Sequence, residues 1–511
     1  MAMTRSGDSP TSIARVLREY CVVRQLNRRP TGINDLPHDV LVLILRDAFS
    51  KTRRFFSRTR IYGQENTTEW ASRPPYDDRN PEHASAECLA SVCPLWREAM
   101  SGLSVFWTQL IIWVGTDPTP LSRIRQYLSW SRDHLLEVYV LRRFDPFMED
   151  RAEKGQIKAI FELLLPHVAR WKILCMALLH ASSLPIPCID LVGRADNLAE
   201  LRLDFLVDDA VESIDNLSPP TSNFDTAELE TLSMSAVHFR EWHVRSFPQR
   251  SLPPRLWWLS LTGYASNQAP WSVAELLNTL LTAKQLCVLY LNNVQLDCSH
   301  PDPPLARPKR YGWQVDVTFT DMSAEVIAEY NRLLSDPYVE AVSYIRCSIP
   351  NGDSLSLRPV NSSYNVTLDQ IADPLATLYF LTVVAGPFSY AIAHIYDCDG
   401  LCPETLSALA TTTRTDDGEV FSCFDLRELH IGGCKRFQSS DLRAMLEARY
   451  KAHEATGFAT EDDEGYVVTS VRELHVHDCC ELDPKDKEWL NKHLESVYWD
   501  DWKGGTGPLP F

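Results

Sequence analysis

Histidine and cysteine residues gather in the last quarter of the chain, where they could bind a metal ion. The segment HVHDCC, residues 475–480, holds two histidines and two cysteines, and CDGLC, residues 398–402, holds two more cysteines. Imidazole and thiolate are the usual zinc ligands, but a structural zinc site normally shows matched C-x-x-C pairs, which these segments lack. We therefore expect no metal site and no cofactor, and we interpret the cysteines as reduced core thiols.

The sequence shows no catalytic signature. It contains no G-x-S-x-G, no P-loop and no H-E-x-x-H, the motifs that mark common nucleophile, nucleotide and zinc-hydrolase sites. Cys93 could act as a nucleophile, but a cysteine on the apolar face of a helix more often belongs to the core. We expect a non-catalytic protein, with a divergent hydrolase as an alternative.

Composition indicates a folded protein with more than one core. The chain has 511 residues, 45% of them hydrophobic, and a formal net charge of -18, which argues against a nucleic-acid partner because phosphate binding needs clustered Lys and Arg. The basic stretch at residues 51–60 is interpreted as a solvated loop, with a nucleic-acid or import patch as the alternative. We identify no secretory signal and no transmembrane run, so we expect a cytoplasmic or nuclear protein without a membrane partner.

Two amphipathic segments near the N-terminus carry much apolar surface. INDLPHDVLVLILRDAF predicts a helix with Pro37 in its first turn. LASVCPLWREAM, residues 89–100, has apolar residues at helical spacing, and Trp96 within it is soon followed by Phe106 and Trp107. A fragment this short cannot bury three such rings alone, so either a larger core or a partner protein must cover them.

The order of these residues resembles the F-box, as in the F-box proteins with leucine-rich repeats that are abundant in mushroom-forming fungi (basidiomycetes). The match consists of Leu-Pro opening one helix, then Val-Cys-x-x-Trp-Arg, then Phe-Trp. The resemblance implies a three-helix module that docks on the Skp adaptor of a cullin-containing SCF-type E3 ubiquitin ligase. The residues that it assigns to the Skp-adaptor interface are Leu36, Pro37, Leu41, Ile44, Leu45, Val92, Cys93, Trp96 and Trp107.

We place this F-box-like domain at residues 32–110, with an insertion at about 51–83 that departs from the family pattern. Residues 1–31 are predicted to contain a helix that packs on the domain, with a self-associating coil as the alternative. The insertion is rich in Arg, Pro and Asp and is expected to be a mobile surface loop.

Residues 121–495 repeat the leucine-rich pattern L-x-x-L-x-L-x-x-N/C and predict an irregular α/β solenoid, a horseshoe with helices on its convex side. The fourth positions of the pattern are Leu174, Leu201, Leu232, Leu259, Leu289, Val315, Val342, Ala393, Leu429 and Leu474. Their spacing is 26 to 31 residues up to Val342 and then 51, 36 and 45 residues, which indicates insertions or a missed repeat. A first, poorly matching repeat is suggested near Val138, and residues 496–511 are expected to be a flexible tail.

The fifth and seventh positions of the repeats should face outward on the concave sheet, because strand side chains alternate between faces. In the last three aligned repeats the fifth position is His394, His430 and His475. The seventh position is Tyr396 in the first of these repeats and His477 in the last. We expect the histidines to stack into a ladder that binds a target protein and changes charge near neutral pH; the alternative is a set of ordinary exposed polar residues.

Together these features predict the substrate-receptor subunit of an SCF-type ubiquitin ligase. Its F-box-like module would bind the Skp adaptor and its repeats an unknown target protein. The alternative is a leucine-rich-repeat scaffold that does not assemble into a ligase.

Overall fold

The computed structural model describes residues 36–53, 86–142, 152–210, 223–245, 251–265, 268–298, 315–334, 339–349, 363–381, 391–415, 418–421, 423, 426–458 and 468–508. The predicted helix within residues 1–31 and most of the predicted insertion lie outside these ranges. The chain divides into two units. Residues 1–109 and 125–134 form what we call the helical unit, and residues 110–124 and 135–511 form the sheet unit.

The helical unit contains short helices in the part that is described. They are α2 (His38–Arg53), α3 (Ala86–Ser91), α4 (Pro94–Gly102), the 3-10 turn η5 (Ser104–Trp107) and the end of α5 (Leu121–Trp130). The expectation of one helix over residues 89–100 is wrong, because Pro94 cannot continue α3 and instead begins α4. The Cys93 thiol caps α4 by accepting a hydrogen bond from the Trp96 amide at 3.5 Å.

Buried aromatic rings form part of the core of the helical unit. Phe106 and Trp107 are both buried. The ring of Trp107 stacks on Tyr127 with centroids 5.2 Å apart and lies 4.4 Å from the ring of Trp130. Its indole N–H donates to the Met100 carbonyl at 2.9 Å. The core of this unit, rather than a partner, therefore covers Phe106 and Trp107.

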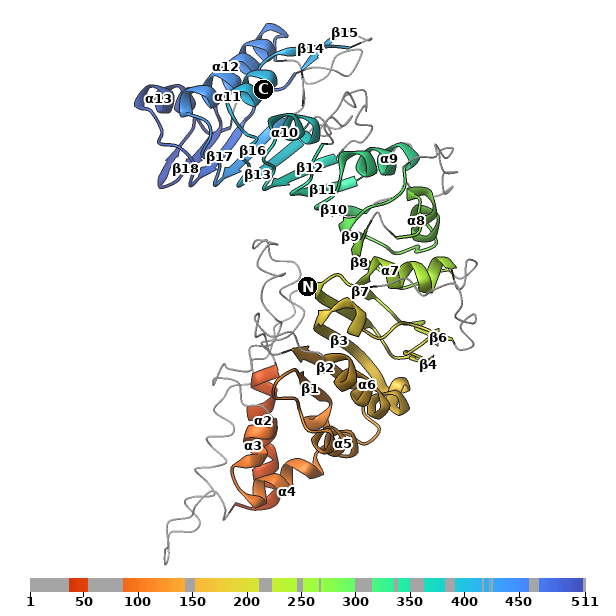
Figure 1. Cartoon of the computed structure of the whole chain (residues 1–511). Helices are drawn as coiled ribbons and strands as arrows, with labels where there is room; N and C mark the ends of the chain where they lie inside the picture. The colour runs from red at the N-terminus through yellow and green to blue at the C-terminus, as the bar shows by residue number, and fades with distance from the viewer. Residues whose placement is uncertain are drawn as a thin grey trace, which may run out of the picture. The chain divides into compact units, whose positions relative to one another are not determined.

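The sheet unit is mixed α/β and is built on a long, mostly parallel sheet (Figure 1). Fifteen strands of the described residues join it in the order β1 (Gln109–Val114), β2 (Leu136–Arg142), β3 (Trp171–His180), β5 (Glu200–Val207), β7 (Thr231–Ser235), β8 (Trp258–Tyr264), β9 (Val288–Val294), β10 (Asp316–Thr320), β11 (Val339–Ile345), β12 (Ser363–Asp369), β13 (Ala391–Tyr396), β16 (Leu426–Gly432), β17 (Glu473–His477), β18 (Ser496–Trp499) and β19 (Trp502–Gly504). Two strand pairs stand apart from it, β4 (Gly193–Arg194) with β6 (Phe224–Asp225), and β14 (Thr412–Thr415) with β15 (Gly418–Phe421).

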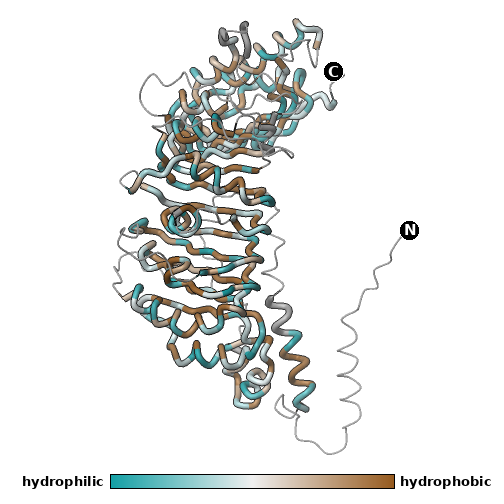
Figure 2. Tube along the Cα trace, turned by 90° about the vertical axis from the view of Figure 1, so that its right-hand side faces the viewer, coloured by the Kyte–Doolittle hydropathy of each residue, from teal (hydrophilic) through white to brown (hydrophobic). Residues whose placement is uncertain are grey.

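The strands pair in the register that the repeat pattern predicts, with two corrections. Val317, not Val315, is the fourth-position residue of β10, because it pairs with Leu289 on one side and Val342 on the other. The spacing of 51 residues hides a missed repeat, β12, in which Val366 takes the fourth position. Val138 pairs with Leu174, so the suggested first repeat is also present. The fourth and sixth positions of β3, β5, β7 to β13 and β16 to β18 are buried and form the core of the sheet unit. Figure 2 shows hydrophobic positions recurring from strand to strand.

Two of the long spacings are insertions. The β14–β15 hairpin lies between β13 and β16, and a helix of 17 residues, α12, lies between β16 and β17. The expected flexible tail is wrong for residues 496–504, because β18 pairs with β17 and β19 pairs with β18. Its apolar alternation, with Val497 and Trp499 buried, explains why this segment joins the sheet.

Helical segments follow most strands of the sheet unit, and neighbouring helices pack on one another (Figure 1). They are α6 (Glu153–Leu164), η6 (Leu165–Arg170), η7 (Ala181–Ser183), α7 (Ala236–Phe239), the π-helical turn η8 (Arg240–Arg245), α8 (Val273–Leu280), α9 (Ala324–Leu334), α10 (Pro374–Leu381), α11 (Pro403–Leu409), α12 (Ser439–Ala455) and α13 (Pro484–His493). Proline is the first residue of α10, α11 and α13, where its missing N–H costs nothing. No helix among the described residues is both long and apolar enough to cross a membrane.

Each strand from β8 to β17 in the long sheet has a left-handed residue at the eighth position of its repeat, within one residue of the end of the strand. These residues are Gly263, Asn293, Asp321, Arg346, Gln370, Asp397, Gly433 and Asp478, with φ between 48° and 73°. Gly, Asn and Asp adopt this conformation most readily. The turn directs the eighth-position amide to the next repeat, as where Asp397 donates to the Gly432 carbonyl at 2.8 Å and Gly433 to the His477 carbonyl at 3.0 Å.

Candidate functional site

The candidate site lies on the face of the sheet that carries the fifth-position side chains, which we call the open face. Four rings stack along it at the C-terminal end: His394, His430, His475 and Tyr498, from β13, β16, β17 and β18. The centroids of successive rings are 4.4, 4.2 and 4.5 Å apart. The predicted histidine ladder is therefore confirmed, and Tyr498, which lies in the segment expected to be a tail, extends it. We call these four residues the ring stack.

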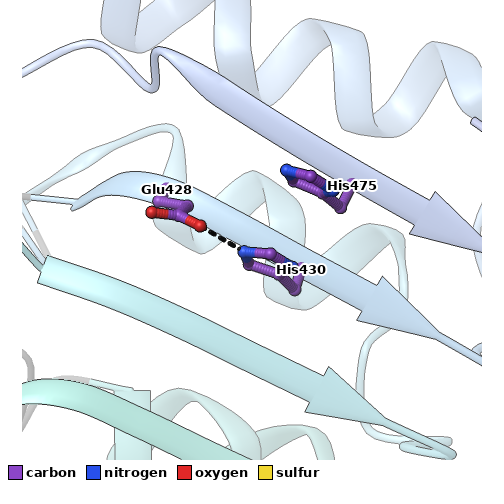
Figure 3. Close-up of side chains that lie close together, drawn as sticks. All are labelled: Glu428, His430 and His475. Atoms are coloured by element: carbon purple, nitrogen blue, oxygen red, sulfur yellow. Dashed lines mark hydrogen bonds and ion pairs between the residues drawn. The ribbon is translucent and has the colours of Figure 1, made fainter. Parts of the chain in front are cut away.

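Two glutamates accompany the ring stack because the sequence Glu-Leu-His occurs on both β16 and β17. Glu428 pairs in register with Glu473, and His430 pairs with His475. The Nε2 atom of His430 lies 2.5 Å from a Glu428 carboxylate oxygen, and the Nε2 atom of His475 lies 4.0 Å from Glu473. Figure 3 shows both histidines on neighbouring strands with Glu428 beside His430.

The surroundings of two histidines in the ring stack, His394 and His475, disfavour their charged forms. Burial, with a smaller contribution from His430, lowers the pKa of His394 to about 4, although Glu428 opposes the shift. Burial and His430 also lower the pKa of His475. The expectation that the ladder changes charge near neutral pH is therefore wrong for His394, because stacked, half-buried imidazoles disfavour the charged form.

The two seventh-position residues named by the sequence lie beside the ring stack. The hydroxyl of Tyr396 is 3.3 Å from Nδ1 of His394. Its ring lies over Gly432, where an added Cβ would be only 2.9 Å from the Tyr396 Cδ1 atom. The side chain of His477 is 85% exposed, with its Nδ1 atom 3.3 Å from Asp500. All five residues predicted to bind a target are thus gathered on β13, β16 and β17.

A second aromatic cluster on the open face was missed by the sequence analysis. The guanidinium of Arg202 lies over the Trp258 ring at 5.3 Å, and the Trp258 and Tyr290 rings are 5.4 Å apart. Arg202 also forms an ion pair of 2.6 Å with Glu200. These residues occupy third and fifth positions of their repeats, so the aligned pattern itself could have identified them.

The structure divides the predicted Skp-adaptor residues into two groups. Leu41, Leu45 and Trp107 are buried inside the helical unit, so their assignment to a partner surface is wrong, since the core of the unit already covers them. The other group is at least partly accessible. Pro37 and Val92 are exposed, and the half-buried residues are Leu36, Ile44, Cys93 and Trp96. Leu43 was not named, yet it is 63% exposed, and Val92 is 59% exposed.

Ninth-position cysteines end several strands as inward-facing thiols. Cys347, Cys398 and Cys434 are buried and Cys479 is half-buried. The Cys347 thiol donates to the Phe319 carbonyl of the preceding repeat at 3.3 Å. Burial raises the pKa of Cys347 and of Cys434 to about 12, which keeps these groups protonated and unsuited to metal binding.

One group of side chains in the described part of the chain could hold a metal ion, and it contains no cysteine. It consists of Glu428, His430 and His475, whose ligand atoms all lie within 4.8 Å of one another. Ligand spacing within single segments does not reveal this group, because its residues come from two strands.

No family model matches the sequence, and no curated protein matches it significantly.

Proposed function

We propose that this protein is a non-catalytic substrate receptor of an SCF-type ubiquitin ligase. In this proposal the helical unit is an F-box-like module that binds the Skp adaptor and through it the cullin. The sheet unit is a leucine-rich-repeat solenoid that binds the target protein with its open face.

The observation that carries the proposal is the exposed apolar surface of the helical unit. Leu41 and Leu45 fix one side of α2 to the core, which leaves Leu43 pointing away from it at 63% exposure. Val92 is exposed because Pro94 ends the preceding helix and turns the chain. Burying a Leu or Val side chain against a partner contributes about 1.5 to 3 kcal/mol. Both residues belong to the two segments that resemble the F-box.

The open face supports a role in recognition. Its two aromatic clusters contain Trp, Tyr and Arg, the residue types that dominate binding energy at protein interfaces. Neighbouring strands on both sides hold the clusters in place, so little side-chain freedom is lost on binding. A scaffold outside any ligase would use the same face, so only the helical unit distinguishes the two functions.

The test is reconstitution with a purified Skp adaptor protein from a mushroom-forming fungus. Size-exclusion chromatography with light scattering should show a complex with one copy of each chain. Trp258→Ala, on the open face, should leave the complex intact. A folded protein that shows no complex would contradict the ligase proposal and favour the scaffold.

A further inference from the structure

We propose that Glu428, His430 and His475 form a binding site for a zinc-like transition-metal ion that bridges two neighbouring repeats. The proposal does not depend on the ligase function. It rests on the ligand set, on its position on the open face, and on the pairing of β16 with β17.

The repeat pattern itself builds the ligand set. Residues two apart on a strand lie on the same face, so Glu-Leu-His presents its carboxylate and its imidazole together. Parallel pairing then places Glu428 beside Glu473 and His430 beside His475, although the histidines are 45 positions apart in the sequence. Two carboxylates and two imidazoles therefore share one small area of the open face.

The distances allow coordination after small side-chain rotations. The ligand atoms of the three residues lie within 4.8 Å of one another. With metal–ligand bonds of about 2.0 to 2.2 Å, tetrahedral geometry needs donor atoms about 3.3 Å apart. The rings of His430 and His475 are stacked within 9° of parallel, so one of them must turn to point its lone pair at the ion. Both side chains retain solvent exposure, 21% and 32%, which leaves room for this rotation.

The ligand chemistry selects the class of metal. Imidazole nitrogens with a carboxylate suit Zn²⁺ and its neighbours, whereas Ca²⁺ and Mg²⁺ prefer sites made of oxygen alone. Two histidines and one glutamate leave one tetrahedral position open. Glu473, whose carboxylate is 4.0 Å from Nε2 of His475, can fill that position; otherwise a ligand from outside the chain can.

The simpler interpretation is that Glu428 only accepts a hydrogen bond from His430 within the ring stack. Isothermal titration of ZnCl₂ into the full chain under reducing conditions distinguishes a metal site from a simple hydrogen bond. We expect one equivalent to bind with a Kd below about 10 µM. Glu428→Gln and His475→Ala should each raise the Kd for this zinc ion at least tenfold.

Two matched controls keep the result specific. His394→Ala removes a ring of the stack that is not in the ligand group, and His477→Ala removes an exposed histidine two residues from His475. Both should bind zinc as the unaltered protein does. Circular dichroism should show that each variant is folded. An unaltered protein that binds no zinc, or ligand variants that bind it as well as the controls do, would overturn the proposal. Neither result bears on Skp binding, so the two proposals fail separately.

Discussion

Replacing Gly433 with alanine tests the left-handed residue found at the eighth position of the strands from β8 to β17. Gly433 has φ +68°, and an added Cβ would lie 1.9 Å from the Oδ1 atom of Asp397 in the neighbouring repeat. Gly457, just beyond α12, has φ +70° but no atom within 4 Å of an added Cβ. The two glycines therefore share a left-handed φ but differ in the space around an added Cβ.

The expected costs follow from these contacts. The left-handed conformation alone costs an alanine about 1 kcal/mol, which is the whole effect expected for Gly457→Ala. In Gly433→Ala the Asp397 carboxylate must also retreat by about 1.5 Å to reach ordinary contact at 3.4 Å. Distorting that side chain and its turn adds about 1 to 2 kcal/mol through an off-rotamer angle and a weakened hydrogen bond. Gly433→Ala should therefore destabilise the protein by about 2 to 3 kcal/mol.

Thermal unfolding of the full-length variants measures the difference, and hydrogen exchange locates it. Gly433→Ala should lower Tm at least twice as much as Gly457→Ala does. It should also speed exchange of the Asp397 and Gly433 amides, which bond to the next strands. Equal shifts in Tm with unchanged exchange at these amides would refute the assignment of the turn.

Three further predictions concern the core and the open face. First, His238 is buried, with its Nδ1 unbonded among the described residues, and burial lowers its pKa from 6.5 to about 4. Between pH 6.5 and pH 4 this imidazole is therefore protonated in the unfolded chain but not in the folded one. The free energy of unfolding should then fall by up to about 3 kcal/mol toward pH 4. Melting curves across this pH range should show a weaker dependence for His238→Gln, and an identical slope would contradict the assignment. Second, Val366→Ala, in the core of the β12 repeat, should lower the free energy of unfolding by about 2 kcal/mol. Thr367→Ala, at the next residue and on the open face, should lower it by less than about 0.5 kcal/mol. The reverse order in chemical denaturation would mean that Thr367 faces the core and Val366 the open face. Combining His430→Ala with His475→Ala should weaken capture of the target, measured by mass spectrometry of cross-linked proteins, and change Tm by less than about 2 °C; a large loss of Tm with capture intact would mean that these side chains support the core.

The sequence predicts the sheet well where leucine recurs and poorly where the pattern is only alternation. A shift by two residues keeps every side chain on the same face, so alternation in VDVTF could not separate Val315 from Val317. The β12 repeat was missed because its core residues are Val366 and Leu368 in a strand of otherwise polar residues. Pro374, Pro403 and Pro484, by contrast, mark helix starts directly.

The site could be predicted in part, for a related reason. Fifth positions of aligned repeats must lie side by side in a parallel sheet, which is why the three histidines of the ring stack were foreseen. Tyr498 was not, because its segment was expected to be a tail. The Glu428, His430 and His475 group unites two strands, so a search for ligand spacing within one segment could not find it. In the helical unit, residue type alone could not show that Leu43 is exposed while Leu41 and Leu45 are buried.

The most direct test of the ligase proposal is the affinity of the Skp adaptor for a protein altered on the helical unit. Isothermal titration with the unaltered protein should give a Kd below about 1 µM. Combining Leu43→Asp with Val92→Asp should weaken binding at least about 100-fold, because two apolar contacts are lost and charge is introduced. Leu206→Asp is the matched control, since Leu206 is also 63% exposed but lies on β5 of the sheet unit. Equal affinity for the double variant and the control, or no binding by the folded, unaltered protein, would contradict the proposal.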